Sequence, residues 1–168
     1  NIDRWWRSFT VSTVAPEGTD PILDVCTGTG DLALAYNDAA KGDVRIYGVD
    51  FCREMLDVAE QKKADSKIGD HVTFQEGDAL NLEFPDNQFQ IVSVAFGLRN
   101  VADTDRGIAE LTRVCKPGGR VAVLEFSIPE WPPMSWMYSF YFHTVLPRVG
   151  QWFTSSSHDA YRYLPESV

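Results

Sequence analysis

Apolar and polar positions follow two different periods along most of this chain. Short runs rich in Val, Ile, Leu and aromatic residues predict strands at residues 21–25, 44–50, 71–77, 89–96 and 120–127. Between these runs, apolar residues recur every three or four positions, which predicts amphipathic helices at residues 31–40, 53–66 and 104–115. Apolar strands that alternate with helices form a parallel sheet covered on both faces. The pattern therefore predicts an α/β fold.

Two segments outside this alternating region have a different composition. Residues 1–20 predict a short helix and a loop. Residues 128–168 are dense in Trp, Tyr, Phe and Met. They are nevertheless too polar, and too often interrupted by prolines, to span a bilayer. We expect one or two aromatic helices there, packed over the sheet as a substrate-side or lid segment. With 44% hydrophobic residues in 168 positions, residues 1–168 are expected to form a single domain.

The charge and the cysteines limit the kinds of partner. The 15 Lys and Arg against 24 Asp and Glu give a net charge of −9, which argues against nucleic acid because phosphate binding requires a basic face. Cys26, Cys52 and Cys115 are widely spaced and form no CxxC, so we expect neither a disulfide framework nor a zinc site, and no metal. Reduced thiols, with no signal peptide and no long apolar run, favour a cytoplasmic location.

A glycine-rich turn follows the first predicted strand. Residues 24–33 read DVCTGTGDLA, in which Gly28 and Gly30 form a GxG and Ala33 completes a G-x-G-x-x-A pattern. Glycines at this position let backbone amides approach a ligand closely. The pattern is compatible with a nicotinamide dinucleotide, with another nucleotide-like cofactor, or with a tight turn that binds nothing.

Acidic residues near the strand ends help to distinguish these cofactors. Asp50 ends the second strand, where a carboxylate accepts the ribose hydroxyls of NAD or S-adenosylmethionine, caps the next helix, or does both. Asp24 gives the D-x-x-x-G-x-G form usual in methyltransferases and is expected to orient the loop and a methionine amino group. Asp78, after the third strand, is either an acceptor for an adenine edge or an ordinary loop residue. The KPGG of residues 116–119, whose proline ends the last helix, also matches Rossmann-like methyltransferases, so S-adenosylmethionine is favoured over NAD.

The chain resembles the UbiE/MenG family of quinone-biosynthesis C-methyltransferases over nearly its whole length. The resemblance is carried by LDVCTGTGDLAL, GVDFCREML, EGDALNLEFPDNQF, CKPGGRVAVLEFSIP and, most specifically, FGLRNVAD and AYRYLPESV. It implies methylation of a ring carbon of a polyprenylated benzoquinol or demethylmenaquinol, with S-adenosylmethionine as donor and S-adenosylhomocysteine as product. It also implies a Rossmann-like sheet of seven strands. Five are expected here, in the order 3-2-1-4-5, so the chain is expected to be truncated at both ends.

The motifs and the resemblance together suggest catalytic and cofactor residues. Arg99 and Asn100 of FGLRN follow the fourth strand, where Arg99 is expected to stabilise a quinolate and Asn100 to orient an oxygen. Alternatively, Arg99 forms a salt bridge that holds the loop, and Glu125 either pairs with an arginine or lines the pocket. His143 is the third catalytic candidate, either as a base or as a packed residue of the aromatic segment, and water, Asp31 and Tyr161 are other candidate bases. The candidates for cofactor binding are Asp24, Cys26, Thr27, Gly28, Gly30, Asp50, Phe51, Met55, Asp78, Ala79 and Phe96.

The substrate side is expected to be apolar. Its candidate lining residues are Phe96, Met134, Tyr138 and Tyr141, and a polyprenylated substrate suggests a peripheral contact at the inner face of the membrane. A homo-oligomer is compatible with the sequence. The alternatives are a methyltransferase of another small molecule, a nucleotide-binding module without activity, and a nicotinamide oxidoreductase. The sequence argues against the oxidoreductase, because it has neither a third glycine in the motif nor a clear set of residues for hydride transfer.

Overall fold

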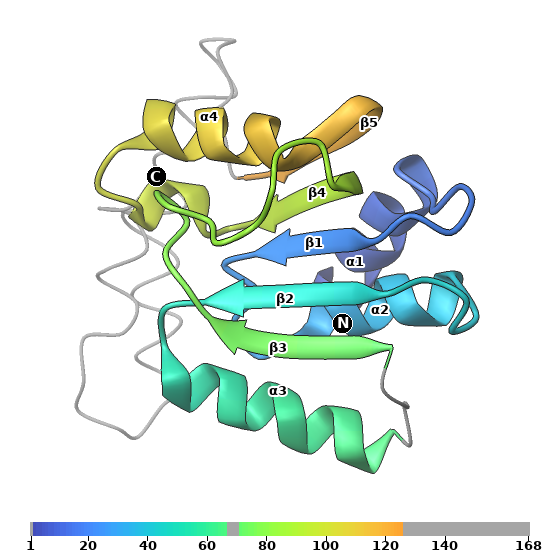
Figure 1. The fold of residues 1–168 in the computed structure, drawn as a ribbon. Helices are drawn as coiled ribbons and strands as arrows, with labels where there is room; N and C mark the ends of the chain where they lie inside the picture. The colour runs from blue at the N-terminus through green and yellow to red at the C-terminus, as the bar shows by residue number, and fades with distance from the viewer. Residues whose placement is uncertain (1, 67–70, 126–168) are drawn as a thin grey trace, which may run out of the picture. The chain divides into compact units, whose positions relative to one another are not determined.

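The computed structural model describes residues 2–66 and 71–125. Within them, five parallel strands form one sheet in the order β3-β2-β1-β4-β5 (Figure 1). The strands are β1 (Ile22–Val25), β2 (Ile46–Asp50), β3 (Val72–Glu76), β4 (Phe89–Ala95) and β5 (Cys115–Leu124). The helices are α1 (Ile2–Thr13), α2 (Asp31–Ala39), α3 (Arg53–Asp65), α4 (Thr104–Val114) and the short 3-10 helix η1 (Leu98–Asn100). The predicted fold class and strand order are confirmed.

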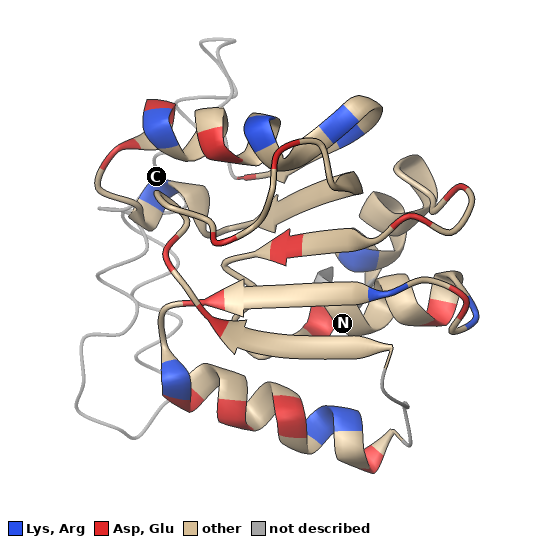
Figure 2. Cartoon of the chain, viewed as in Figure 1, with Lys and Arg blue, Asp and Glu red and all other residues tan. Residues whose placement is uncertain are grey.

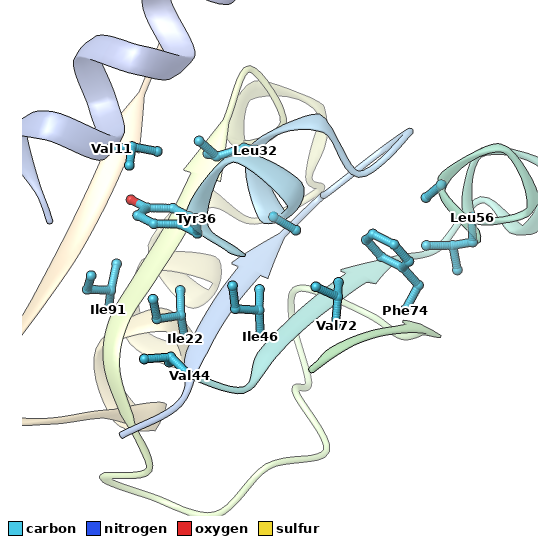
Figure 3. Close-up of a cluster of buried hydrophobic side chains, with 12 residues drawn as sticks. Val11, Ile22, Leu32, Tyr36, Val44, Ile46, Leu56, Val72, Phe74 and Ile91 are labelled. Carbon is cyan, nitrogen blue, oxygen red and sulfur yellow. The ribbon is translucent and has the colours of Figure 1, made fainter. Parts of the chain in front are cut away.

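Side chains alternate between the two faces of the sheet, and each face carries its own core. Ile22 of β1 faces a core shared with α1, α2 and α3, whereas Leu23 and Val25 face a core shared with α4. Figure 3 shows the first core, in which Tyr36 of α2 lies near Val11 of α1. The sheet is therefore covered on both faces, as its apolar runs predicted.

The fifth strand differs from its predicted range. We expected a turn at residues 116–119 and a strand from residue 120, but β5 begins at Cys115, which already pairs with Phe89. The next pair joins Arg120 to Ile91, so the KPGG sequence forms a bulge inside the strand instead of a connection before it. Gly118 supplies the positive φ of +79° that this bulge requires. The helix does end at Val114, as the proline predicted.

Contacts within the chain divide it after Glu125. The predicted aromatic segment of residues 128–168 lies outside the described residues, and with it His143, Met134, Tyr138, Tyr141 and Tyr161. The expected single domain therefore stays a prediction. In the described part of the chain, no helix is both long enough and apolar enough to cross a bilayer.

Candidate cofactor site

The carboxyl ends of four neighbouring strands meet at one edge of the sheet. From β1 the chain continues to β2 and β3 on one side, and from β4 it continues to β5 on the other, so strand order reverses between β1 and β4. Ligands of such sheets bind outside the carboxyl ends at this point. Figure 2 shows acidic residues near these ends of β1, β2 and β3. The structure thus brings the segments that carry most of the predicted site residues to one edge.

The two glycines of the turn after β1 serve different purposes. Both have positive φ, +56° at Gly28 and +77° at Gly30, which few other residues adopt without strain. A Cβ on Gly30 would lie 2.5 Å from Cζ of Phe74, so this glycine allows α2, of which it is the N-cap, to pack closely on the sheet. A Cβ on Gly28 would meet only Met55, whose Cε lies 3.6 Å away. The space beside Gly28 is therefore open to a ligand, whereas the space beside Gly30 is filled by the protein.

Asp50 clamps this turn from the end of β2. Its Oδ2 accepts the Gly28 N–H at 2.7 Å, and its Oδ1 accepts the Cys52 N–H at 3.0 Å. The alternative that Asp50 caps the following helix is wrong, because Cys52 is the N-cap residue of α3. A carboxylate offers about four acceptor positions, so these two bonds leave capacity for ribose hydroxyls. The ribose contact stays a prediction.

Asp24 lies inside the protein, with 1% of its surface exposed. Its Oδ2 accepts the Thr27 hydroxyl and its Oδ1 accepts the Ser93 hydroxyl, both at 2.6 Å. Burial raises the pKa of the carboxyl to about 6, although the two hydroxyls oppose this rise. Asp24 thus orients the loop, as expected, but acts on it through Thr27. The expected contact with a methionine amino group stays a prediction.

The turn after β3 is organised by Asp78. Its Oδ1 accepts the Leu80 N–H at 2.8 Å, and its backbone oxygen accepts the Asn81 N–H at 3.0 Å. This is the local turn role that we considered as an alternative, and the side chain is also exposed at the site edge. Ala79 packs against the core on the α4 side. An adenine contact by Asp78 stays a prediction.

Two exposed apolar side chains lie around the start of α3, and one of them, Met55, lies beside Gly28. Phe51 is 76% exposed and Met55 is 42% exposed. Large apolar side chains this exposed are available to cover the flat face of a bound ring. Their predicted role in cofactor binding is compatible with this position and is not otherwise tested.

Two strained residues mark the ends of the central strands. Cys26 follows β1 with φ +54°, and Phe96 follows β4 with φ +56°. The backbone segments that follow β1 and β4 approach each other so closely that a Cβ on Gly97 would lie 2.3 Å from the Cβ of Cys26. Such strain clusters at functional sites. Burial and nearby carboxylates raise the pKa of the Cys26 thiol to about 12, so this thiol stays protonated and has a packing role.

Arg99 lies in η1, directly after β4, and is paired with Glu125. Its Nη1 donates to Glu125 Oε1 at 2.6 Å, and its backbone N–H donates to Oε2 at 3.4 Å. The salt bridge that we considered is confirmed, and so is the expectation that Glu125 pairs with an arginine. Asn100 ends η1 and is exposed. The quinolate contact of Arg99 and the oxygen contact of Asn100 stay predictions.

Sequence reasoning missed three contributors to this edge. Ser93 holds Asp24, Gly97 allows the close approach to Cys26, and Lys62 donates to Asp31 at 2.9 Å, so this candidate base is ion-paired. A glycine directly after an aromatic residue in FGLRN was the signal for Gly97, whereas a serine inside an apolar strand carries no comparable signal. Among residues 2–66 and 71–125, no group of three or more His, Cys, Asp or Glu side chains could hold a metal ion.

Comparison with known proteins identifies the family. A model of the ubiE/COQ5 methyltransferase family matches residues 1–168. The chain is 44% identical to "Ubiquinone/menaquinone biosynthesis C-methyltransferase UbiE" of Geotalea daltonii, over 99% of this chain and 70% of that protein. It is 45% identical to "Demethylmenaquinone methyltransferase" of Thermus thermophilus, over 99% of this chain and 74% of that protein.

A solved methyltransferase structure shares the fold. Phosphoethanolamine N-methyltransferase 2 of Haemonchus contortus, in complex with S-adenosyl-L-methionine, superimposes with a TM-score of 0.61 and 28% identity. The match covers 70% of this chain and 27% of that one. The predicted enzyme class, an S-adenosylmethionine-dependent methyltransferase, is confirmed, and the oxidoreductase alternative is excluded. The chain belongs to the ubiE/COQ5 methyltransferase family.

Proposed function

We propose that this enzyme transfers the methyl group of S-adenosylmethionine to a ring carbon of a polyprenyl quinol. The observation that carries the proposal is the position of Arg99 beside the glycine turn. β1 and β4 are neighbours in the sheet, with Val25 paired to Val94, so the segments that follow them lie side by side. A quinol held after β4 would therefore meet a cofactor held after β1.

The residues of the turn fit the cofactor. Gly28 offers a place without a Cβ, where a ligand can approach the backbone. Asp50 is the candidate for the ribose hydroxyls, Asp78 for the adenine edge, and Phe51 and Met55 for the ring faces. When bound, S-adenosylmethionine supplies a methyl group that is already activated by its positive sulfur.

This chain must make the ring carbon nucleophilic. A quinol hydroxyl resembles a phenol, with a pKa of about 10, and a cation beside it lowers that pKa by about 1–3 units. The guanidinium of Arg99 would stabilise the quinolate and so increase the electron density on the ring. Arginine does not readily act as a base, so another group removes the proton.

A polyprenyl substrate also requires access to a lipid phase. The described part of α1 offers a surface suited to it, with Trp5 59% exposed and stacked on Phe9, which is 50% exposed. Aromatic side chains of this kind favour the interface between lipid and water. We therefore include a peripheral membrane contact in the proposal. Co-sedimentation with phospholipid vesicles, compared between the wild type and Trp5→Ala, tests this part, and equal binding of the two would refute a role for Trp5.

Product analysis tests the reaction. The enzyme is incubated with methyl-labelled cofactor and either demethylmenaquinol or a demethylated benzoquinol, and the label is located by NMR. Label on a ring carbon supports the proposal, and label on oxygen refutes it. The two substrates also show which quinol is used.

A variant tests the role of Arg99. We expect Arg99→Ala to lower kcat by about 10²–10³-fold, the usual effect of removing one charge-stabilising donor, with little change in cofactor affinity. Arg106→Ala, on the exposed side of α4, is the matched control and should retain activity. Equal losses of turnover and of cofactor affinity in Arg99→Ala would make Arg99 a structural residue.

A further inference from the structure

A chain of buried hydrogen bonds connects β4 to the glycine turn. The Ser93 hydroxyl donates to Asp24, which accepts the Thr27 hydroxyl on its other oxygen, each at 2.6 Å. Thr27 in turn accepts the Gly30 N–H at 2.9 Å through its backbone oxygen. Ser93 and Asp24 are both 1% exposed, and Thr27 is 9% exposed. The geometry of the turn therefore depends on a side chain in a neighbouring strand.

The surroundings make the charge of Asp24 depend on these hydroxyls. Burial is the largest influence and disfavours the ionised carboxylate, and Asp50 at the end of β2 adds like-charge repulsion. The Ser93 bond is the strongest contact that favours ionisation, followed by the Thr27 bond and the backbone of Ala33 in α2. The Tyr36 hydroxyl of α2 is also buried nearby. Burial raises its pKa, the Asp24 charge adds to the rise, and Ser93 opposes it. Replacing Ser93 with a residue that lacks a hydroxyl would thus remove the hydrogen bond that most favours the ionised form of Asp24.

We propose that Ser93 is a positioning residue for the cofactor, acting through Asp24 to hold Thr27 and the glycine turn in their binding geometry. The inference rests on the proposed cofactor site after β1. This role of Asp24 makes cofactor affinity depend on pH. A protonated Asp24 has no negative charge and binds the Thr27 hydroxyl less firmly, so the glycine turn is held less well in its binding geometry. Ionised Asp24 binds the hydroxyls as an acceptor only, which is the geometry that the structure records.

The dissociation constant of S-adenosylhomocysteine, measured by calorimetry between pH 5 and pH 8 on the whole chain, tests the proposal. In the wild type, affinity should fall as the pH drops through about 6, where Asp24 becomes protonated. In Ser93→Ala the midpoint of this fall should move up by about 1 pH unit, the expected effect of losing one hydrogen bond to a buried charge. Ser93→Thr, which retains the hydroxyl, should keep the wild-type midpoint.

Two controls separate this effect from loss of stability. Val94→Ala truncates the next residue of β4, which is 1% exposed and faces the other core, and should leave the midpoint unchanged. Asp24→Asn cannot titrate, so adding Ser93→Ala to it should produce no further pH shift. A midpoint that stays the same in Ser93→Ala, or that moves equally in Val94→Ala, would overturn the inference alone. Absence of S-adenosylhomocysteine binding by the wild type at any pH would overturn the cofactor assignment and this inference together.

Discussion

Ionised Asp24 should lower the free energy of unfolding, although it holds the glycine turn in place, and Asp24→Asn tests this. Burial raises the pKa of the carboxyl from 3.8 to about 6. Because one pKa unit corresponds to 1.36 kcal/mol, this rise means that ionised Asp24 lowers the free energy of unfolding by about 3 kcal/mol above pH 6. Asparagine has nearly the same shape and carries no charge. We expect Asp24→Asn to be about 1–3 kcal/mol more stable than the wild type at pH 8.

The direction of the pH dependence follows from proton binding. Between pH 3.8 and about 6, the folded protein holds a proton on Asp24 that the unfolded chain has released. The contribution of Asp24 to stability is therefore present below pH 3.8 and is lost as the pH rises through 6. The stability difference between variant and wild type should grow over this window and be constant above it.

Urea unfolding of both proteins between pH 4 and pH 8 measures this difference. Asp57→Asn is the matched control, because Asp57 is 60% exposed and pairs with Arg53 on the helix surface, where the change should stay within about 0.5 kcal/mol. The stabilised Asp24→Asn protein should also bind S-adenosylhomocysteine at least about tenfold more weakly at pH 8, since its bond to Thr27 is no longer charge-assisted. A stability difference that is the same at pH 4 and pH 8 would refute the reasoning.

Other substitutions test the packing and the ion pairs of the site. Gly30→Ala should destabilise by more than about 2 kcal/mol in urea, because its Cβ would lie 2.5 Å from Phe74, whereas Gly18→Ala, with a similar φ but nothing within 4 Å, should cost only about 1 kcal/mol. Arg113→Lys should lower the midpoint of thermal unfolding by at least about 2 °C, because a lysine cannot make the five hydrogen bonds of this guanidinium, three to residues 82–86 and two to Glu110 of α4. Glu125→Gln should lower kcat about tenfold without changing cofactor affinity, because it removes the charge that fixes the Arg99 guanidinium.

Each of these expectations has a result that contradicts it. Equal losses of stability in Gly30→Ala and Gly18→Ala would show that the contact with Phe74 is unimportant. An Arg113→Lys protein with the wild-type melting temperature would mean that the charge alone holds the loop. Unchanged turnover in Glu125→Gln would separate the ion pair from catalysis.

The sequence by itself determined the elements and the family. Hydrophobic periodicity is a local property, so the ranges of β1 to β4 and α2 to α4 could be predicted to within two residues. The glycine turn, Asp50 and FGLRN are contiguous motifs that carry chemistry at fixed places relative to strand ends. Because the carboxyl ends of parallel strands share one edge of the sheet, these motifs also indicated where the site lies.

Only the tertiary structure decided what each polar side chain does. A strand sequence does not reveal that Asp24 points inward to Ser93, 69 residues away, or that Arg99 meets Glu125, 26 residues away. The bulge in β5 depends likewise on how Cys115 and Arg120 align with β4. These contacts arise when strands pair and bring distant residues within hydrogen-bonding distance. Burial then sets the energy of each charge. Asp24 was expected from the sequence to orient the loop and a methionine amino group, and only the structure shows that it holds the loop through Thr27 and is itself held by Ser93.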